Sequence, residues 1–142
     1  MDGMHTFARR SFRTVTPTPG GTYQPGVCNI GPDEIAQRRR AGHIGAIVTL
    51  GLLAFLLLLR LPPAWRLAVA IPAAGTAITY LQAILHFCVA FGMAGVFNFG
   101  RVGRTTPVAK EAARRADRAR AARMIVAGSA IGLAVGVAAV LL

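Results

Sequence analysis

Three apolar stretches divide this chain. No Asp, Glu, Lys or Arg occurs in residues 41–59, 67–100 or 124–142, which are runs of 19, 34 and 19 residues. About 18–20 apolar residues are enough for a helix to cross a bilayer, and a soluble domain rarely contains even one such run. The pattern therefore predicts an all-α membrane protein with three transmembrane helices, a polar N-terminal arm and a basic cytoplasmic helical segment.

Five segments follow from this pattern. We expect a polar extended arm over 1–31, because its Pro and Gly residues oppose regular structure. A helix over 32–60 should begin amphipathic and become the first transmembrane helix, and a tight outer turn should follow over 61–66. The second transmembrane helix and an interfacial tail are expected over 67–100. A basic cytoplasmic segment that continues into the third transmembrane helix is expected over 101–142.

Local signals refine the helix boundaries. Pro32 suits the first position of a helix, where its missing N–H costs nothing. The second run is too long for one span and too short for two, so we expect a helix over 67–90 that bends near Pro72. Pro107 predicts the first turn of the helix that leads into the third span.

The basic residues are segregated as well. The chain has 16 Lys and Arg against five acids, for a net charge of +11. Six basic residues precede the first span, two lie between the first two spans, and eight lie in 101–123. The positive-inside rule then places the N-terminus in the cytoplasm and the C-terminus outside. The Arg, Ala and Gly bias suggests a GC-rich bacterial genome, hence a bacterial inner membrane.

The charge thus indicates topology and contact with anionic lipids, and nucleic acid is not an expected partner. Composition also excludes an ordinary soluble enzyme. The basic residues expected to set topology and to meet lipid headgroups are Arg38, Arg39, Arg40, Arg114, Arg115 and Arg118.

Two helix faces are predicted to pack against other helices. Small residues spaced by four allow another backbone to approach closely, and the third span contains such a row. The second span has a polar face that should point at protein rather than lipid. The first row consists of Gly128, Gly132 and Gly136, and the second face of Gly75, Thr79, Gln82 and His86.

Four residues are candidate ligands. The predicted topology puts His43, Cys28, His86 and Cys88 near the cytoplasmic side, and these side-chain types suit Zn, Cu or iron. His86 and Cys88 point about 200° apart on an ideal helix, so both cannot bind one ion. His86 as a haem or chlorin ligand stays open beside an interhelical hydrogen bond, and the cysteines stay open as small buried apolar residues.

Two segments carry a resemblance. CNIGPDEIAQRRRAGHIG (28–45) and LQAILHFCVAFGMAGVFNFG (81–100) resemble a family of small bacterial integral membrane proteins that share CNIGPxEI, RRRxGH and HFC…GVFNFG segments. The resemblance covers roughly residues 28–123. It implies a membrane protein class and no particular activity.

The sequence favours a structural role. It contains no phosphate loop, nucleotide fingerprint or nucleophile elbow, and its spans lack acids. We therefore expect no enzyme, but a non-catalytic accessory or assembly subunit of a larger respiratory or photosynthetic membrane complex. Its partners would be other membrane subunits and anionic lipids. It would require no cofactor of its own, although it would be placed to contact a partner's haem or chlorin.

Two alternatives remain open at this point. One is a small redox, metal- or haem-handling membrane protein that uses His43, His86, Cys28 and Cys88. The other is a homo-oligomer that associates through the Gly128 row.

Overall fold

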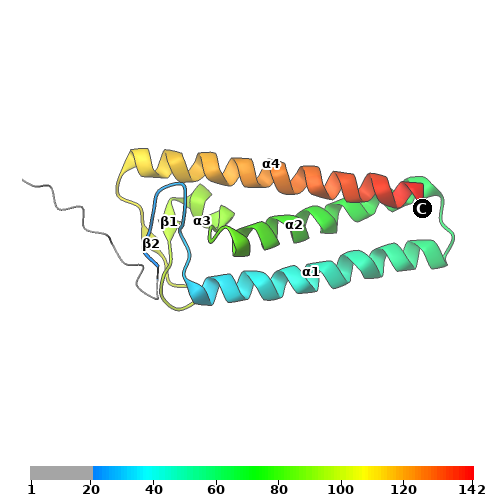
Figure 1. Ribbon diagram of the computed structural model, residues 1–142, viewed down its shortest axis with the longest axis horizontal. Coiled ribbons are helices and arrows are strands. Elements are labelled where there is room, and N and C mark those ends of the chain that lie inside the picture. The colour runs from blue at the N-terminus through cyan, green and yellow to red at the C-terminus, as the bar shows by residue number, and fades with distance from the viewer. Residues whose placement is uncertain (1–20) are drawn as a thin grey trace, which may run out of the picture.

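The computed structural model describes residues 21–142, so residues 1–20 of the predicted arm lie outside the described residues. The described chain is mostly helical, as the apolar pattern predicts (Figure 1). Three helical stretches are long and apolar enough to cross a membrane. They are α1 (Pro32–Leu58), the 3-10 helix η1 (Pro63–Val69) with α2 (Ala70–Ile84), and α4 (Glu111–Leu141).

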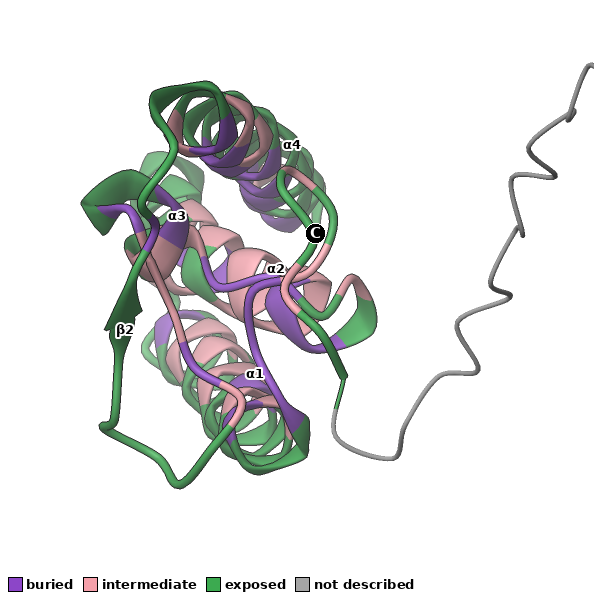
Figure 2. Cartoon of the chain, turned by 90° about the vertical axis from the view of Figure 1, so that its left-hand side faces the viewer, coloured by how far each residue is buried: buried purple, intermediate pink, exposed green. Residues whose placement is uncertain are grey.

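The three long helices lie side by side, with α2 between the other two (Figures 1 and 2). The remaining elements gather at the end of the bundle where α1 begins and α2 ends. They are α3 (Val89–Ala94) and two short strands, β1 (Val96–Phe97) and β2 (Thr106–Pro107), which pair antiparallel.

The α2–α4 contact is made through the glycine row. A Cβ added at Gly132 would lie 2.5 Å from the backbone nitrogen of Ala74, and one at Gly136 would lie 2.6 Å from the Cβ of Ala70. Gly128 meets Ile78 in the same way. The row therefore lies directly against α2 of the same chain.

The α1–α2 contact also passes through glycine. A Cβ added at Gly42 would lie 2.9 Å from the ring of Tyr80, and one at Gly45 would lie 2.5 Å from the hydroxyl of Thr76. Because both neighbours of α2 lack side chains at the contact, their backbones approach it closely. Such close approach increases van der Waals contact, which is a main force between helices in a lipid bilayer.

Two helices end at non-glycine residues in the left-handed conformation. Arg60 has φ 51° after α1, and the N–H of Leu61 donates to the carbonyl of Leu56 at 3.2 Å. His86 has φ 53° after α2, and the N–H of Phe87 donates to the carbonyl of Gln82 at 3.1 Å. Both are Schellman terminations, which satisfy carbonyls at the helix end.

This termination explains one wrong boundary. The second long helix ends at Ile84 rather than near residue 90, because His86 reverses the backbone. Similarly, α4 begins at Glu111, and Pro107 lies in β2 instead of the first helical turn. The predicted turn over 61–66 is shorter, since η1 starts at Pro63.

The outward faces of the long helices are apolar. Exposed large side chains cover α1, α2 and α4, and the buried residues of α4 form a single inward stripe (Figure 2). Apolar exposure on this scale suits an apolar surrounding medium. Examples are Ile47 at 71% exposure, Ile71 at 78% and Val126 at 69%.

Replacing Gly132 by Leu should separate α4 from α2. We expect a loss of about 1–3 kcal/mol or more in the free energy of unfolding, because the new side chain has no space. Gly51→Leu is the matched control, since a Cβ at Gly51 meets nothing within 4 Å. Thermal unfolding in detergent measures both, and equal stability of the two variants would contradict the packing.

Candidate functional site

A folded polar structure covers one end of the helices. Residues 21–31 and 85–110 form this unit, here called the polar cap (Figures 1 and 2). It joins the two segments that carry the family resemblance, because Ile30 forms a bridge with Asn98. Residues 21–31 of the predicted arm are thus packed against the helix ends.

Asn29 is the central residue of the cap and is fully buried. Its side chain accepts a hydrogen bond from the N–H of Cys88 at 2.6 Å and donates to the Cys88 carbonyl at 3.0 Å. Its own N–H donates to the carbonyl of His86, and its carbonyl accepts from the N–H of Asn98. Every polar group of Asn29 is therefore paired, and the residue ties residues 86–88 to residue 98.

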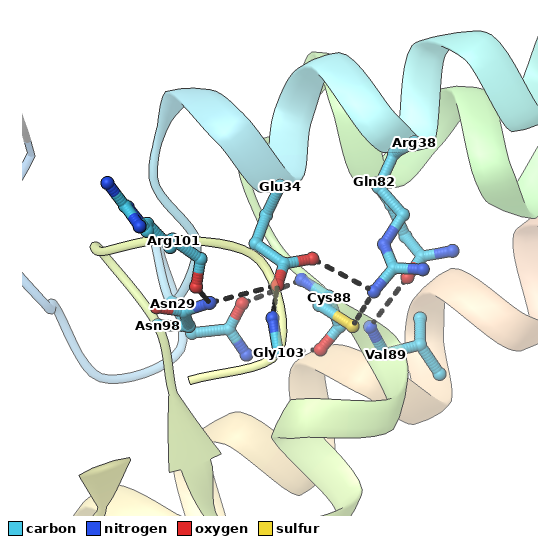
Figure 3. A network of polar contacts seen from close by, with 9 residues as sticks. All are labelled: Asn29, Glu34, Arg38, Gln82, Cys88, Val89, Asn98, Arg101 and Gly103. Carbon is cyan, nitrogen blue, oxygen red and sulfur yellow. Dashed lines mark hydrogen bonds and ion pairs between the residues drawn. The ribbon is translucent and has the colours of Figure 1, made fainter. Parts of the chain in front are cut away.

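A second buried set surrounds the carboxylate of Glu34 (Figure 3). Asn98 donates to Glu34 through its side-chain amide at 2.9 Å, and the N–H of Gly103 donates at 3.3 Å. Arg38 lies one turn along α1 and forms an ion pair with Glu34 at 3.4 Å. These three donors offset the cost of burying a carboxylate.

Arg38 also reaches the buried thiol. Its guanidinium donates to Sγ of Cys88 at 3.2 Å and lies 6.0 Å from the ring centre of Phe91. One residue of the predicted basic cluster is thus directed inward as a structural residue. Gln82 completes the set, because its side-chain oxygen accepts from the N–H of Val89 at the start of α3 (Figure 3).

Asp117 anchors the N-terminal part of the cap to α4. It is fully buried, accepts a hydrogen bond from the hydroxyl of Tyr23 at 2.7 Å and accepts another from the N–H of Gly26 at 2.7 Å. The ring of Tyr23 stacks on Phe97 with centres 4.7 Å apart. Asp117 was not among the candidate residues, although it is the only acid after Glu111 in the sequence.

Burial and hydrogen bonding shift two acid–base groups in the cap. Burial, and then the hydrogen bond to Asp117, raise the pKa of Tyr23 well above its ordinary value. Burial raises the pKa of Cys28, and a hydrogen bond with the backbone at Ile30 partly opposes this. The Cys28 thiol also donates to the Ile30 carbonyl at 3.7 Å. Both groups are therefore held protonated at neutral pH.

The four candidate ligands occupy separate environments. His86 is exposed, and His43 pairs with the hydroxyl of Tyr80 at 2.7 Å through Nδ1. Cys28 and Cys88 are free thiols with the hydrogen bonds described above. Across residues 21–142, no three His, Cys, Asp or Glu side chains form a group that would hold a metal ion.

The predicted polar face of the second span is divided. Gly75 faces open space, and the hydroxyl of Thr79 donates to the Gly75 carbonyl at 2.7 Å. Gln82 is buried in the cap network, whereas His86 lies beyond the helix end. Gly75 contacts neither α1 nor α4, because both helices approach α2 from other directions. That this side of α2 points at protein therefore stays a prediction.

An apolar groove of about 360 Å³ lies on the side of α2 that is opposite Gly75. Both flanking helices contribute walls, and three hydroxyl groups are the polar members of the lining. It is lined by Ala46, Thr49, Leu50, Ala73, Thr76, Ala77, Tyr80, Ile131 and Val135. Its size and its mainly apolar surface are those of a small-molecule or lipid site.

The other predicted basic residues remain at the surface of the cap end. Arg39, Arg40 and Arg118 are exposed. Arg114 and Arg115 both pair with Glu111, at 2.7 and 3.5 Å. The hydrogen bonds from Arg114, and then its positive charge, hold the pKa of the exposed Glu111 carboxyl below its ordinary value.

No protein-family model, curated protein or solved structure matches this chain.

The stabilisation from the contact between Tyr23 and Asp117 should be lost at strongly alkaline pH. The raised pKa means that the folded state favours the protonated phenol, so this stabilisation is complete below about pH 10 and is lost as pH rises through the folded pKa. Tyr23→Phe should cost about 1 kcal/mol at pH 8. The free energy of unfolding of the wild type and of Tyr23→Phe, measured across pH, tests this. A difference in stability that persists after Tyr23 ionises would contradict it.

His86→Gly should leave stability unchanged or raise it by up to about 1 kcal/mol. Gly removes the strain of the left-handed conformation, which is about 1–2 kcal/mol, but adds freedom to the unfolded chain. Arg60→Gly is the matched control at the equivalent position after α1. Thermal unfolding measures both. A loss at residue 86 alone would show that the imidazole makes a stabilising contact.

Proposed function

We propose that this protein is a non-catalytic accessory or assembly subunit of a larger membrane protein complex. The observation that carries the proposal is the use of its buried polar residues. Within residues 21–142, the five buried polar residues all form hydrogen bonds that hold the polar cap on the helix ends. They are Asn29, Glu34, Gln82, Asn98 and Asp117.

The proposed orientation puts the polar cap in the cytoplasm. Three long apolar helices would cross the membrane, and the arginine-rich end of α4 lies at the cap. The positive-inside rule supports this placement, and the C-terminus would then lie outside a bacterial inner membrane.

The open side of α2 supports a partner helix. The backbone of Gly75 is open there, the hydroxyl of Thr79 is bonded to the Gly75 carbonyl, and Ile71 is 78% exposed. A small, flat surface of this kind allows close approach of a second backbone. By contrast, the Gly128 row is already occupied by α2, so self-association through that row would require α4 to leave its place.

Purification from native membranes in mild detergent tests this role. The wild-type chain should carry a stoichiometric membrane protein with it, and Gly75→Leu should reduce that recovery about tenfold or more. Gly51→Leu is the matched control, because both glycines are open and helical. A solitary wild-type monomer, or equal loss from both variants, would contradict the proposal.

A further inference from the structure

The groove between α1 and α4 has a charged end. Successive residues of an α-helix are rotated by about 100°, so residues on one face can be followed along the axis. On α1, Arg39 lies on the face of the groove-lining Ala46 and Leu50, at i+7 and i+11. On α4, Arg120 lies on the face of Ile131, at i+11.

The two arginines also lie at a similar height. Tyr80 of α2 packs against Gly42, so Arg39 is one turn closer to the polar cap than this contact. Ile78 packs against Gly128, so Arg120 is two turns closer to the cap. The backbone positions of Arg39 and Arg120 therefore flank the last turn of α2, within about one helical turn of each other along the bundle.

Their surroundings leave these charges for an external anion. Within residues 21–142, neither Arg39 nor Arg120 forms an ion pair, and the buried Nε of Arg120 has no hydrogen-bond partner. Arg38 also has a buried Nε without a partner within these residues, but its charge is paired with Glu34. On the groove face between the two arginines, Ile84 is 69% exposed and has the register of the lining residue Ala77.

A polar pair lies between the charged end and the apolar groove. His43 and Tyr80 are joined by a 2.7 Å hydrogen bond, and Tyr80 lines the groove. From the cap inward, the order is thus arginine, then a hydroxyl–imidazole pair, then an apolar wall. A phospholipid has the same order of phosphate, ester and acyl chain.

We propose that this groove binds one anionic phospholipid, with an acyl chain along α2 and its phosphate between Arg39 and Arg120. The tail would lie against the small residues Ala46, Ala73 and Ala77. This site is distinct from the open side of α2 around Gly75, so it does not depend on the proposed subunit role.

Native mass spectrometry of the purified chain tests the charged end. The probes are phosphatidylglycerol and phosphatidylcholine, added separately. Wild-type protein should retain one phosphatidylglycerol in preference to phosphatidylcholine. Arg39→Gln with Arg120→Gln should weaken retention about 25-fold, since each arginine near a membrane surface contributes roughly fivefold. Arg40→Gln with Arg123→Gln removes the same charge from neighbouring positions on other faces and should change retention less than threefold.

A second pair of variants tests the apolar groove. Ala77→Phe should fill it and abolish selective lipid retention, while Ala134→Phe, on the exposed outer face of α4, should not. Unfolding temperatures establish that each variant is folded. Equal effects of the two charge pairs, or full retention by Ala77→Phe, would overturn the site. Loss of a co-purifying protein from Ala77→Phe with lipid retention intact would instead assign the groove to a partner helix.

Discussion

The close approach of the α2 backbone to both neighbouring helices determines the arrangement of the rest. Glycines on α1 and α4 remove the side chains that would hold the helices apart. Because α2 is contacted on two sides by residues without a Cβ, α1 and α4 are drawn around it. The concave side becomes a groove lined by small residues, and the convex side leaves Gly75 open. Both proposed binding surfaces follow from this single packing mode.

The polar cap is stabilised by buried hydrogen bonds rather than by close packing of helix backbones. Its buried amides and carboxylates gain stability through complete hydrogen bonding, since an unpaired buried group costs more than a formed bond returns. Asn29 and Asn98 each connect segments that are distant in sequence. The cap therefore fixes the ends of helices whose apolar surfaces provide little directional information.

The apolar runs and the glycine spacing were sufficient to predict the three long helices, because length and small-residue periodicity act locally. The cap was not predicted. Asn29, Asn98 and Asp117 are single polar residues whose partners lie far along the chain, and no local period reveals such pairs. The left-handed residue His86 was also missed, because that conformation usually requires Gly or Asn. Consequently, the polar face predicted from Gly75 to His86 stops where α2 ends, at Ile84.

The hydrogen bond from Tyr23 to Asp117 links residues 94 positions apart and imposes an order on biosynthesis. At about 5–20 residues per second, a ribosome needs on the order of 5–20 s to reach Asp117 after it has added Tyr23. Both α1 and α2 are synthesised during that interval, before the anchor for residues 21–26 exists. The nascent chain thus presents an incomplete cap, and the last polar attachment forms only when the first turns of α4 have been synthesised.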